Sequence, residues 1–146
     1  MMSGWISIRS LMPWAGAPPY LLANERYEDT ARVLDEADFT VWQADLTRVV
    51  DEVSLLESIF GAMHPSESSH CNWEALNDRL GEQQSGPSGS VALLLQNADA
   101  LLEANPRVLV RGVHILQSLS EQAEAAAHST GFQFEVFHFG QFGTVL

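Results

Sequence analysis

The stretch VALLL, at residues 91–95, is a continuous apolar run without a polar side chain. A short run of this kind is typical of a strand in a parallel sheet that helices cover on both faces. We therefore expect these residues to form a central strand of an α/β domain.

Strand-like and helical segments alternate on both sides of this run. β-branched and aromatic side chains predict a strand at residues 39–44, and residues 132–139 carry apolar side chains in a largely alternating pattern. The short run YLLA, at residues 20–23, is a further candidate strand. The expected fold class is α/β, with helices packed on a small, mostly parallel sheet of three strands, or four if residues 20–23 join it.

Helical periodicity fills the segments between these strands. It runs through residues 25–38 and through residues 47–63, where Thr47 can cap the helix. Pro106 suits an early position of a long later helix, which Gly131 can terminate.

The chain of 146 residues has the length of one domain. Residues 1–18 are expected to form an N-terminal arm or extension. It would consist of an arm or strand, followed by a link that contains Pro and Gly. Trp5 and Trp14 suggest that part of it is buried. Residues 19–146 are expected to form a single domain.

The charge is strongly acidic, with 19 Asp and Glu residues against 7 basic ones and a formal net charge of −12. Residues 25–82 hold fourteen of the acids and four arginines, a local net charge of −10. Such a surface repels phosphate backbones, which argues against direct nucleic-acid binding. It suits a basic protein partner, although acidity alone is more often a matter of solubility.

The single cysteine, Cys71, allows no intramolecular disulfide, which fits a reducing cytoplasm. The N-terminal stretch is a poor signal peptide, because no charge precedes its apolar run and Pro13 interrupts that run. No stretch approaches the roughly 20 apolar residues of a membrane span. We expect a cytoplasmic chain with no membrane contact, and its oligomeric state is left open.

The stretch NWEALNDRL, at residues 72–80, predicts a short helix that Asn72 can cap. At about 100° per residue, Trp73, Leu76 and Leu80 fall on one stripe, which is expected to pack in the core. Glu74 and Asp78 share a second face, where like charges at this spacing disfavour the helix slightly. On physical grounds alone, that face is best read as solvated surface.

The same stretch resembles the signature of the barstar family, the bacterial ribonuclease inhibitors. The matching residues are Asn72, Trp73, Ala75, Leu76, Asp78 and Leu80, and Glu74 is a conservative replacement. The order of strands and helices resembles the family as well, over about residues 39–140. The resemblance implies a barstar-like fold and a protein that occludes the active site of a ribonuclease, as an immunity protein against a secreted or toxin nuclease.

The resemblance also implies which residues contact the partner. In the family, the second acidic residue of this helix, matched by Asp78, enters the phosphate-binding site of the nuclease. Glu74 takes the first acidic position, and Glu121 falls near a further acidic contact. A carboxylate in that site accepts the charge-assisted hydrogen bonds that a phosphate accepts.

The sequence departs from the family pattern in two places. Family members commonly carry an aromatic pair and Gly before the Asn, where this chain has Ser68, Ser69 and His70, followed by Cys71. Asn77 stands where many relatives have an aromatic residue. Because aromatic side chains are frequent hot spots, these changes point to lower affinity or to another target. The alternative function is therefore a barstar-like interaction module with a non-ribonuclease partner.

A metal site or a thiol enzyme is the remaining alternative. His64, Glu67, His70 and Cys71 lie close in sequence, but their spacing matches no standard ligand pattern. Cys71 precedes a helix N-terminus, which can lower the pKa of a thiol, but its sequence neighbour His70 rarely gives the geometry of a Cys–His pair. We expect no enzyme activity, no catalytic residue, no metal and no cofactor.

Overall fold

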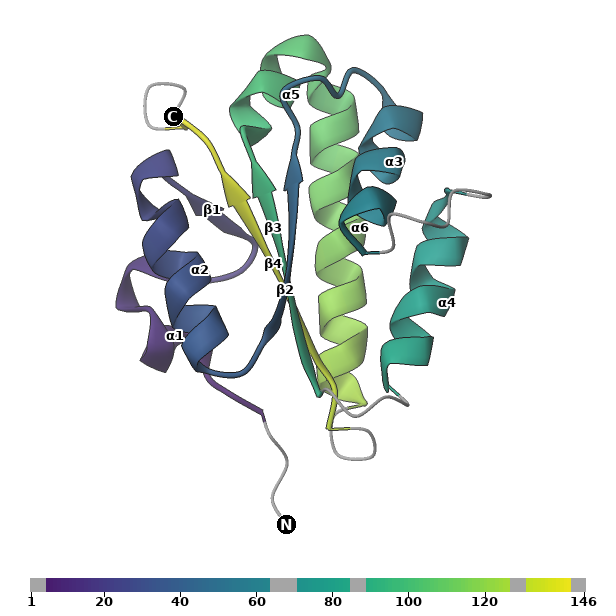
Figure 1. Cartoon of the computed structure of the whole chain (residues 1–146). Helices are drawn as coiled ribbons and strands as arrows, with labels where there is room; N and C mark the ends of the chain where they lie inside the picture. Colours follow the sequence, from purple (N-terminus) through teal and green to yellow (C-terminus); the bar gives the residue numbers. More distant parts are fainter. Residues whose placement is uncertain (1–4, 64–70, 85–88, 127–130, 143–146) are drawn as a thin grey trace.

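Four parallel strands form one sheet in the order β1-β4-β3-β2 (Figure 1). The computed structural model describes residues 5–63, 71–84, 89–126 and 131–142. The strands are β1 (Tyr20–Leu22), β2 (Thr40–Asp45), β3 (Ser90–Gln96) and β4 (Gln133–Phe139). The α/β prediction is confirmed, and the run at residues 20–23 does supply a fourth strand.

Helices cover both faces of the sheet (Figure 1). One face carries α1 (Ile8–Leu11) and α2 (Tyr27–Glu36), together with the short 3-10 turns Pro13–Ala15 and Asn24–Arg26. The other face carries α3 (Glu52–Met63), α4 (Trp73–Gln84) and α6 (Pro106–Ala125), and α5 (Ala98–Ala104) follows the carboxyl end of β3. Among the described residues, no helix has both the length and the apolarity that a membrane span requires.

Strand β3 feeds a separate hydrophobic core on each face. Val91, Leu93 and Leu95 join the core beneath α3, α4 and α6. Ala92 and Leu94 join the core beneath α1 and α2. This double burial explains why VALLL has no polar position, as the sequence indicated.

Strand β4 differs from the alternating pattern expected for it, since every one of its residues is buried. The reason is the N-terminal segment, which forms the helix α1 instead of a strand and packs on the face of the sheet that carries α2. Its helix α1 places Ile8 and Met12 in the second core. Gln133 of β4 also bonds to the segment, accepting from Ile6 N at 2.9 Å and donating to Ile6 O at 2.8 Å.

Helix α3 begins later than predicted. Thr47 does not cap it, because its backbone N and hydroxyl donate to Asp45 Oδ1 at 3.0 and 2.6 Å. Asp51 takes that role, accepting from Ser54 N at 2.9 Å. Val53, one of the apolar residues at helical spacing in residues 47–63, is 60% exposed, because the helix that starts at Glu52 turns other residues to the core. Similarly, α6 ends at Ala125, before Gly131 is reached.

Candidate functional site

Helix α4 starts at a side-chain cap, as the sequence predicted. Asn72 Oδ1 accepts from Ala75 N at 2.7 Å, and Asn72 O accepts from Leu76 N at 3.0 Å. An Asn at this position satisfies backbone N–H groups that have no partner within the helix. The cap therefore fixes where the helix begins, and the helix continues past Leu80 to Gln84.

The apolar stripe of α4 holds the helix on the domain. Leu76 is 1% exposed and Leu80 is also buried, and both belong to the core beneath α3 and α6. Trp73 is partly buried against the same core, and its ring lies near Gly112 of α6. Figure 1 shows α4 beside α6 on this face of the sheet. The predicted core role of all three residues is confirmed.

The opposite side of α4 presents Glu74, Asn77 and Asp78 to solvent. Within the described part of the chain, neither Glu74 nor Asp78 forms an ion pair or a side-chain hydrogen bond. Two exposed carboxylates thus stand one helical turn apart with all their acceptor positions available.

Other acids of the negatively charged region serve the fold. Asp45 accepts hydrogen bonds from Thr47 and from Asn97 Nδ2, the latter at 2.9 Å, and these bonds hold the pKa of Asp45 below its usual value. The bonds that Ser54 gives likewise lower the pKa of Asp51. Structural hydrogen bonding therefore accounts for these two acids but not for the pair on α4.

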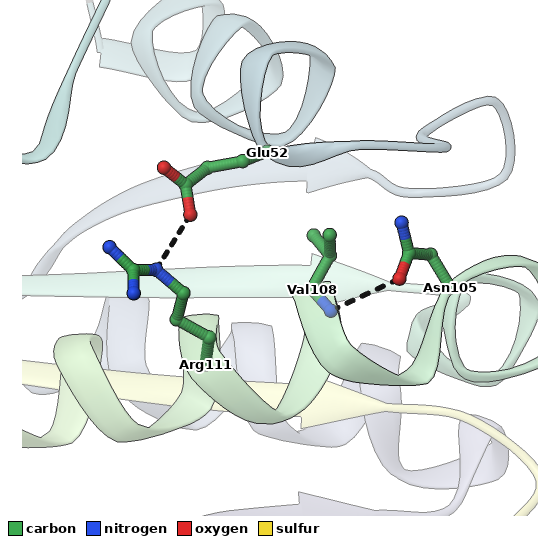
Figure 2. A network of polar contacts seen from close by, with 4 residues as sticks. All are labelled: Glu52, Asn105, Val108 and Arg111. Carbon is green, nitrogen blue, oxygen red and sulfur yellow. Dashed lines mark hydrogen bonds and ion pairs between the residues drawn. The ribbon is translucent and has the colours of Figure 1, made fainter.

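A polar network joins α3 and α6, the two helices that form the core with α4 (Figure 2). Arg111 Nε donates to Glu52 Oε1 at 2.7 Å, with side chains that are 63% and 40% exposed. Asn105 Oδ1 caps α6 by accepting from Val108 N at 3.4 Å, and its Nδ2 donates to Val50 O at 3.1 Å. Exposed ion pairs contribute about 0–1 kcal/mol each, so the network orients the helices more than it stabilises them.

A comparison with protein-family models matches residues 39–138 to Barstar (barnase inhibitor). The match covers more than half of the chain, from the start of β2 almost to the end of β4, and α4 lies inside it. The chain belongs to the barstar family. Members of this family are inhibitors rather than enzymes. Neither the curated proteins nor the solved structures gave a match.

Three of the residues expected to contact a partner lie together on the surface of one helix. These are Glu74, Asn77 and Asp78 on α4. Glu121 is exposed on the neighbouring α6, where its Oε2 accepts from Gln117 Nε2 at 3.4 Å. In the described part of the chain, no hydrogen bond links Glu121 to either acid of α4.

The loop that precedes α4 in this barstar-family chain lies mostly outside the described residues. Ser68, Ser69 and His70 fall there, as do His64 and Glu67 of the metal alternative. Cys71 is described, and it packs half-buried against the core. Among the described residues no three His, Cys, Asp or Glu side chains are grouped for metal binding, and this leaves the His64–Cys71 alternative untested.

The sequence interpretation missed a group of buried polar residues on β4. His138 Nδ1 lies 3.2 Å from Tyr20 O, which can only accept, so the nitrogen carries the proton. Burial lowers the pKa of His138 to about 4 and raises the pKa of Glu135 to about 7. An alternating strand predicts that such residues face solvent. For Glu135, the only hint of a cover was the tryptophan content of residues 1–18.

Proposed function

We propose that this protein inhibits a ribonuclease by placing the outer face of α4 over the active site of the enzyme. The observation that carries the proposal is the pair Glu74 and Asp78 on a helix of a barstar-family chain, two exposed carboxylates that have no ion pair or side-chain hydrogen bond among the described residues. The buried Leu76 and Leu80 hold that helix in place before any partner arrives. A preformed helix reduces the entropy lost on binding.

Asp78 acts as the phosphate mimic in this proposal. A nuclease active site that binds RNA phosphate offers cationic and N–H groups, and a carboxylate accepts paired hydrogen bonds from an arginine in the same manner. Glu74, one turn earlier, meets a second cationic group at the edge of the site. Glu121 of α6 and residues Ser68, Ser69 and His70 before the helix extend the contact surface.

The overall charge supports a basic partner. Residues 25–82 carry a net charge of −10, and α4 lies within this region. Complementary charge mainly accelerates association and contributes less to final affinity. The rate of complex formation is therefore expected to fall steeply with added salt, as Debye screening shortens the reach of the field.

The biological role that follows is that of an immunity protein. The chain would act in the bacterial cytoplasm, where it blocks a nuclease that the cell secretes or a toxin from a neighbour. It would need neither a cofactor nor a catalytic residue, because occlusion of the site is sufficient.

A second candidate is a barstar-type module with a non-ribonuclease target. Asn77 favours it, since this exposed position is aromatic in many relatives, and the aromatic pair expected before Asn72 is replaced by Ser68, Ser69 and His70. Interfaces that lose aromatic anchors commonly lose affinity for the original partner.

Inhibition of RNA cleavage by the ribonuclease encoded beside this gene is the direct test. Equimolar inhibitor should abolish cleavage, and the double variant Glu74→Gln/Asp78→Asn should restore it. The matched control is Asp35→Asn/Glu36→Gln, which removes the same charge from exposed positions of α2 on the other side of the sheet. The second candidate would be favoured if the wild type, the α4 double variant and the α2 control all failed to inhibit, and if a pulldown with the wild type recovered a protein without nuclease activity.

A further inference from the structure

A cavity of about 270 Å³ lies between the N-terminal segment and α6, lined by no residue of α4. Its polar lining comes from four elements that are distant in sequence. These side chains are Ser7 and Arg9 at the start of α1, Tyr20 of β1, Gln117, Ser120 and Glu124 of α6, and Glu135 of β4.

Three of the lining residues are more than nine-tenths buried yet keep unused polar atoms. Tyr20, Ser120 and Glu135 are 7%, 8% and 6% exposed. In the described part of the chain the hydroxyl groups of Tyr20 and Ser120 have no hydrogen-bond partner, and Glu135 accepts a hydrogen bond through Oε2 alone. None of these oxygens is among the side-chain atoms sealed from solvent, so they open onto the cavity. Three accessible oxygens that converge on one cavity, each on a residue that is otherwise buried, can bind a ligand that carries hydrogen-bond donors.

The neighbouring structure holds these groups in position. Gln133 Nε2 donates to Glu135 Oε2 at 2.9 Å while the same amide bonds the backbone of Ile6, so one carboxylate oxygen is fixed and the other is left free. The ring of Tyr20 stacks on Phe137 with 4.9 Å between the centroids, which fixes the direction of its hydroxyl. A site whose groups are held by packing and hydrogen bonds loses little entropy when it binds.

The charges around the cavity favour a cation. Burial, aided by the nearby carboxylates of Glu135 and Glu124 and opposed by Arg9, raises the pKa of Tyr20 to about 12. At the Tyr20 hydroxyl, the negative charges of Glu135 and Glu124 therefore outweigh the positive charge of Arg9. The unused atoms are a carboxylate oxygen and hydroxyl oxygens, all of which accept hydrogen bonds.

We propose that this cavity binds a small organic cation whose head group carries N–H donors, an ammonium or a guanidinium, with Glu135 as its principal acceptor and Tyr20 and Ser120 as further contacts. Pockets for drug-sized ligands measure roughly 300–1,000 Å³, so a cavity of 270 Å³ fits a short ligand. The site is independent of α4, and it stands whether or not the partner is a ribonuclease.

Binding should depend on pH in a defined direction. Burial, opposed by the Gln133 hydrogen bond and aided by Glu124, raises the pKa of Glu135 to about 7. A cation binds the ionised carboxylate, so affinity should fall about tenfold from pH 8 to pH 6, as the ionised fraction falls. Tyr20 stays neutral throughout this range, because its pKa is about 12.

The probe is n-butylammonium, compared with the neutral 1-butanol and with tetramethylammonium, which has no N–H. Titration followed by backbone NMR at pH 8 should shift Tyr20, Ser120 and Glu135 with n-butylammonium alone. Glu135→Gln should weaken binding at least tenfold, and Ser120→Ala severalfold. Glu103→Gln, at an exposed carboxylate of α5, should leave binding unchanged.

Three outcomes would overturn the proposal. The first is equal response to n-butylammonium and 1-butanol. The second is a set of shifts centred on Glu74 and Asp78, which indicates unspecific attraction to the acidic surface. The third is a Kd weaker than about 10 mM in the folded wild-type protein, which leaves only water in the cavity.

Discussion

The outer edge of the Trp73 ring lies 4.0 Å from the point where a Cβ would stand on Gly112. This contact joins the first residue of α4 to the middle of α6. An added Cβ would therefore meet the indole in ordinary van der Waals contact. The tight approach at Gly112 is to Leu55 of α3, whose Cδ2 lies 3.0 Å from the same point.

Substitution of Gly112 should disturb the packing of α3 on α6. A Cβ here would also stand 3.0 Å from Leu55 Cδ2, and Leu55 is only 2% exposed, so it has little room to move. Gly112→Val should lower the free energy of unfolding by about 1–3 kcal/mol through overpacking, against a helix-propensity gain of a few tenths. Urea unfolding measures this. Gly61→Val in α3 is the control, because nothing lies within 4 Å of its Cβ, and a loss of equal size there would refute the packing explanation.

Loss of the Asn72 cap should destabilise α4. Asn72→Ala removes the acceptor that holds Ala75 N at 2.7 Å. The free energy of unfolding should drop by about 1 kcal/mol, the usual effect of losing such a cap. Amide exchange should accelerate at the first turn of α4, whereas Asn72→Asp should behave as wild type. Unchanged exchange in the Ala variant would show that packing alone defines the start of the helix.

Two buried groups on β4 give stability opposite dependences on pH. Burial raises the pKa of Glu135 from 4.5 to about 7. The contribution of the protonated carboxyl group to the free energy of unfolding is therefore fully present below pH 4.5 and is lost as pH rises through 7. Burial lowers the pKa of His138 from 6.5 to about 4, so its contribution is present above pH 6.5 and is lost as pH falls through 4. Between pH 4.5 and 6.5 the two effects nearly cancel.

Glu135→Gln should separate these effects. The variant should match wild type near pH 4.5 and exceed its free energy of unfolding above pH 7, by on the order of 3 kcal/mol. As pH falls from 6.5 to 4 the variant should lose stability steadily, because the protonation of His138 is no longer offset by that of Glu135. Urea titrations across this range measure both curves. Parallel curves for the two proteins would contradict the buried state of Glu135.

The parts of the fold that depend on local pattern were predictable from the sequence. The run VALLL reads as a strand covered on both faces without knowledge of its neighbours, and it forms the core of β3. The stripe of Trp73, Leu76 and Leu80 likewise follows from helical spacing alone, and so does the shared face of Glu74 and Asp78.

What could not be predicted depends on contacts between distant segments. Thr47 is a good N-cap residue, but Asp45, which also binds Asn97, takes its hydroxyl. The alternation of β4 suggested solvent beside Gln133 and Glu135, but residues 5–9 cover them. The cavity joins residues 9, 20, 120 and 135, and no sequence spacing relates them. The partner-binding roles remain predictions for all the expected contact residues, which are Ser68, Ser69, His70, Glu74, Asn77, Asp78 and Glu121.

The dissociation constant of the complex between the Asp78→Ala variant and the ribonuclease tests the central claim most directly. Loss of one partner of a buried interfacial charge pair costs roughly 2–5 kcal/mol, a range to which measurements on barnase with barstar themselves contribute. Asp78→Ala should therefore raise Kd by a factor of about 30 or more, chiefly through faster dissociation, whereas Asp35→Ala on α2 should change it little. Equal Kd values for wild type and Asp78→Ala would show that Asp78 does not enter the active site.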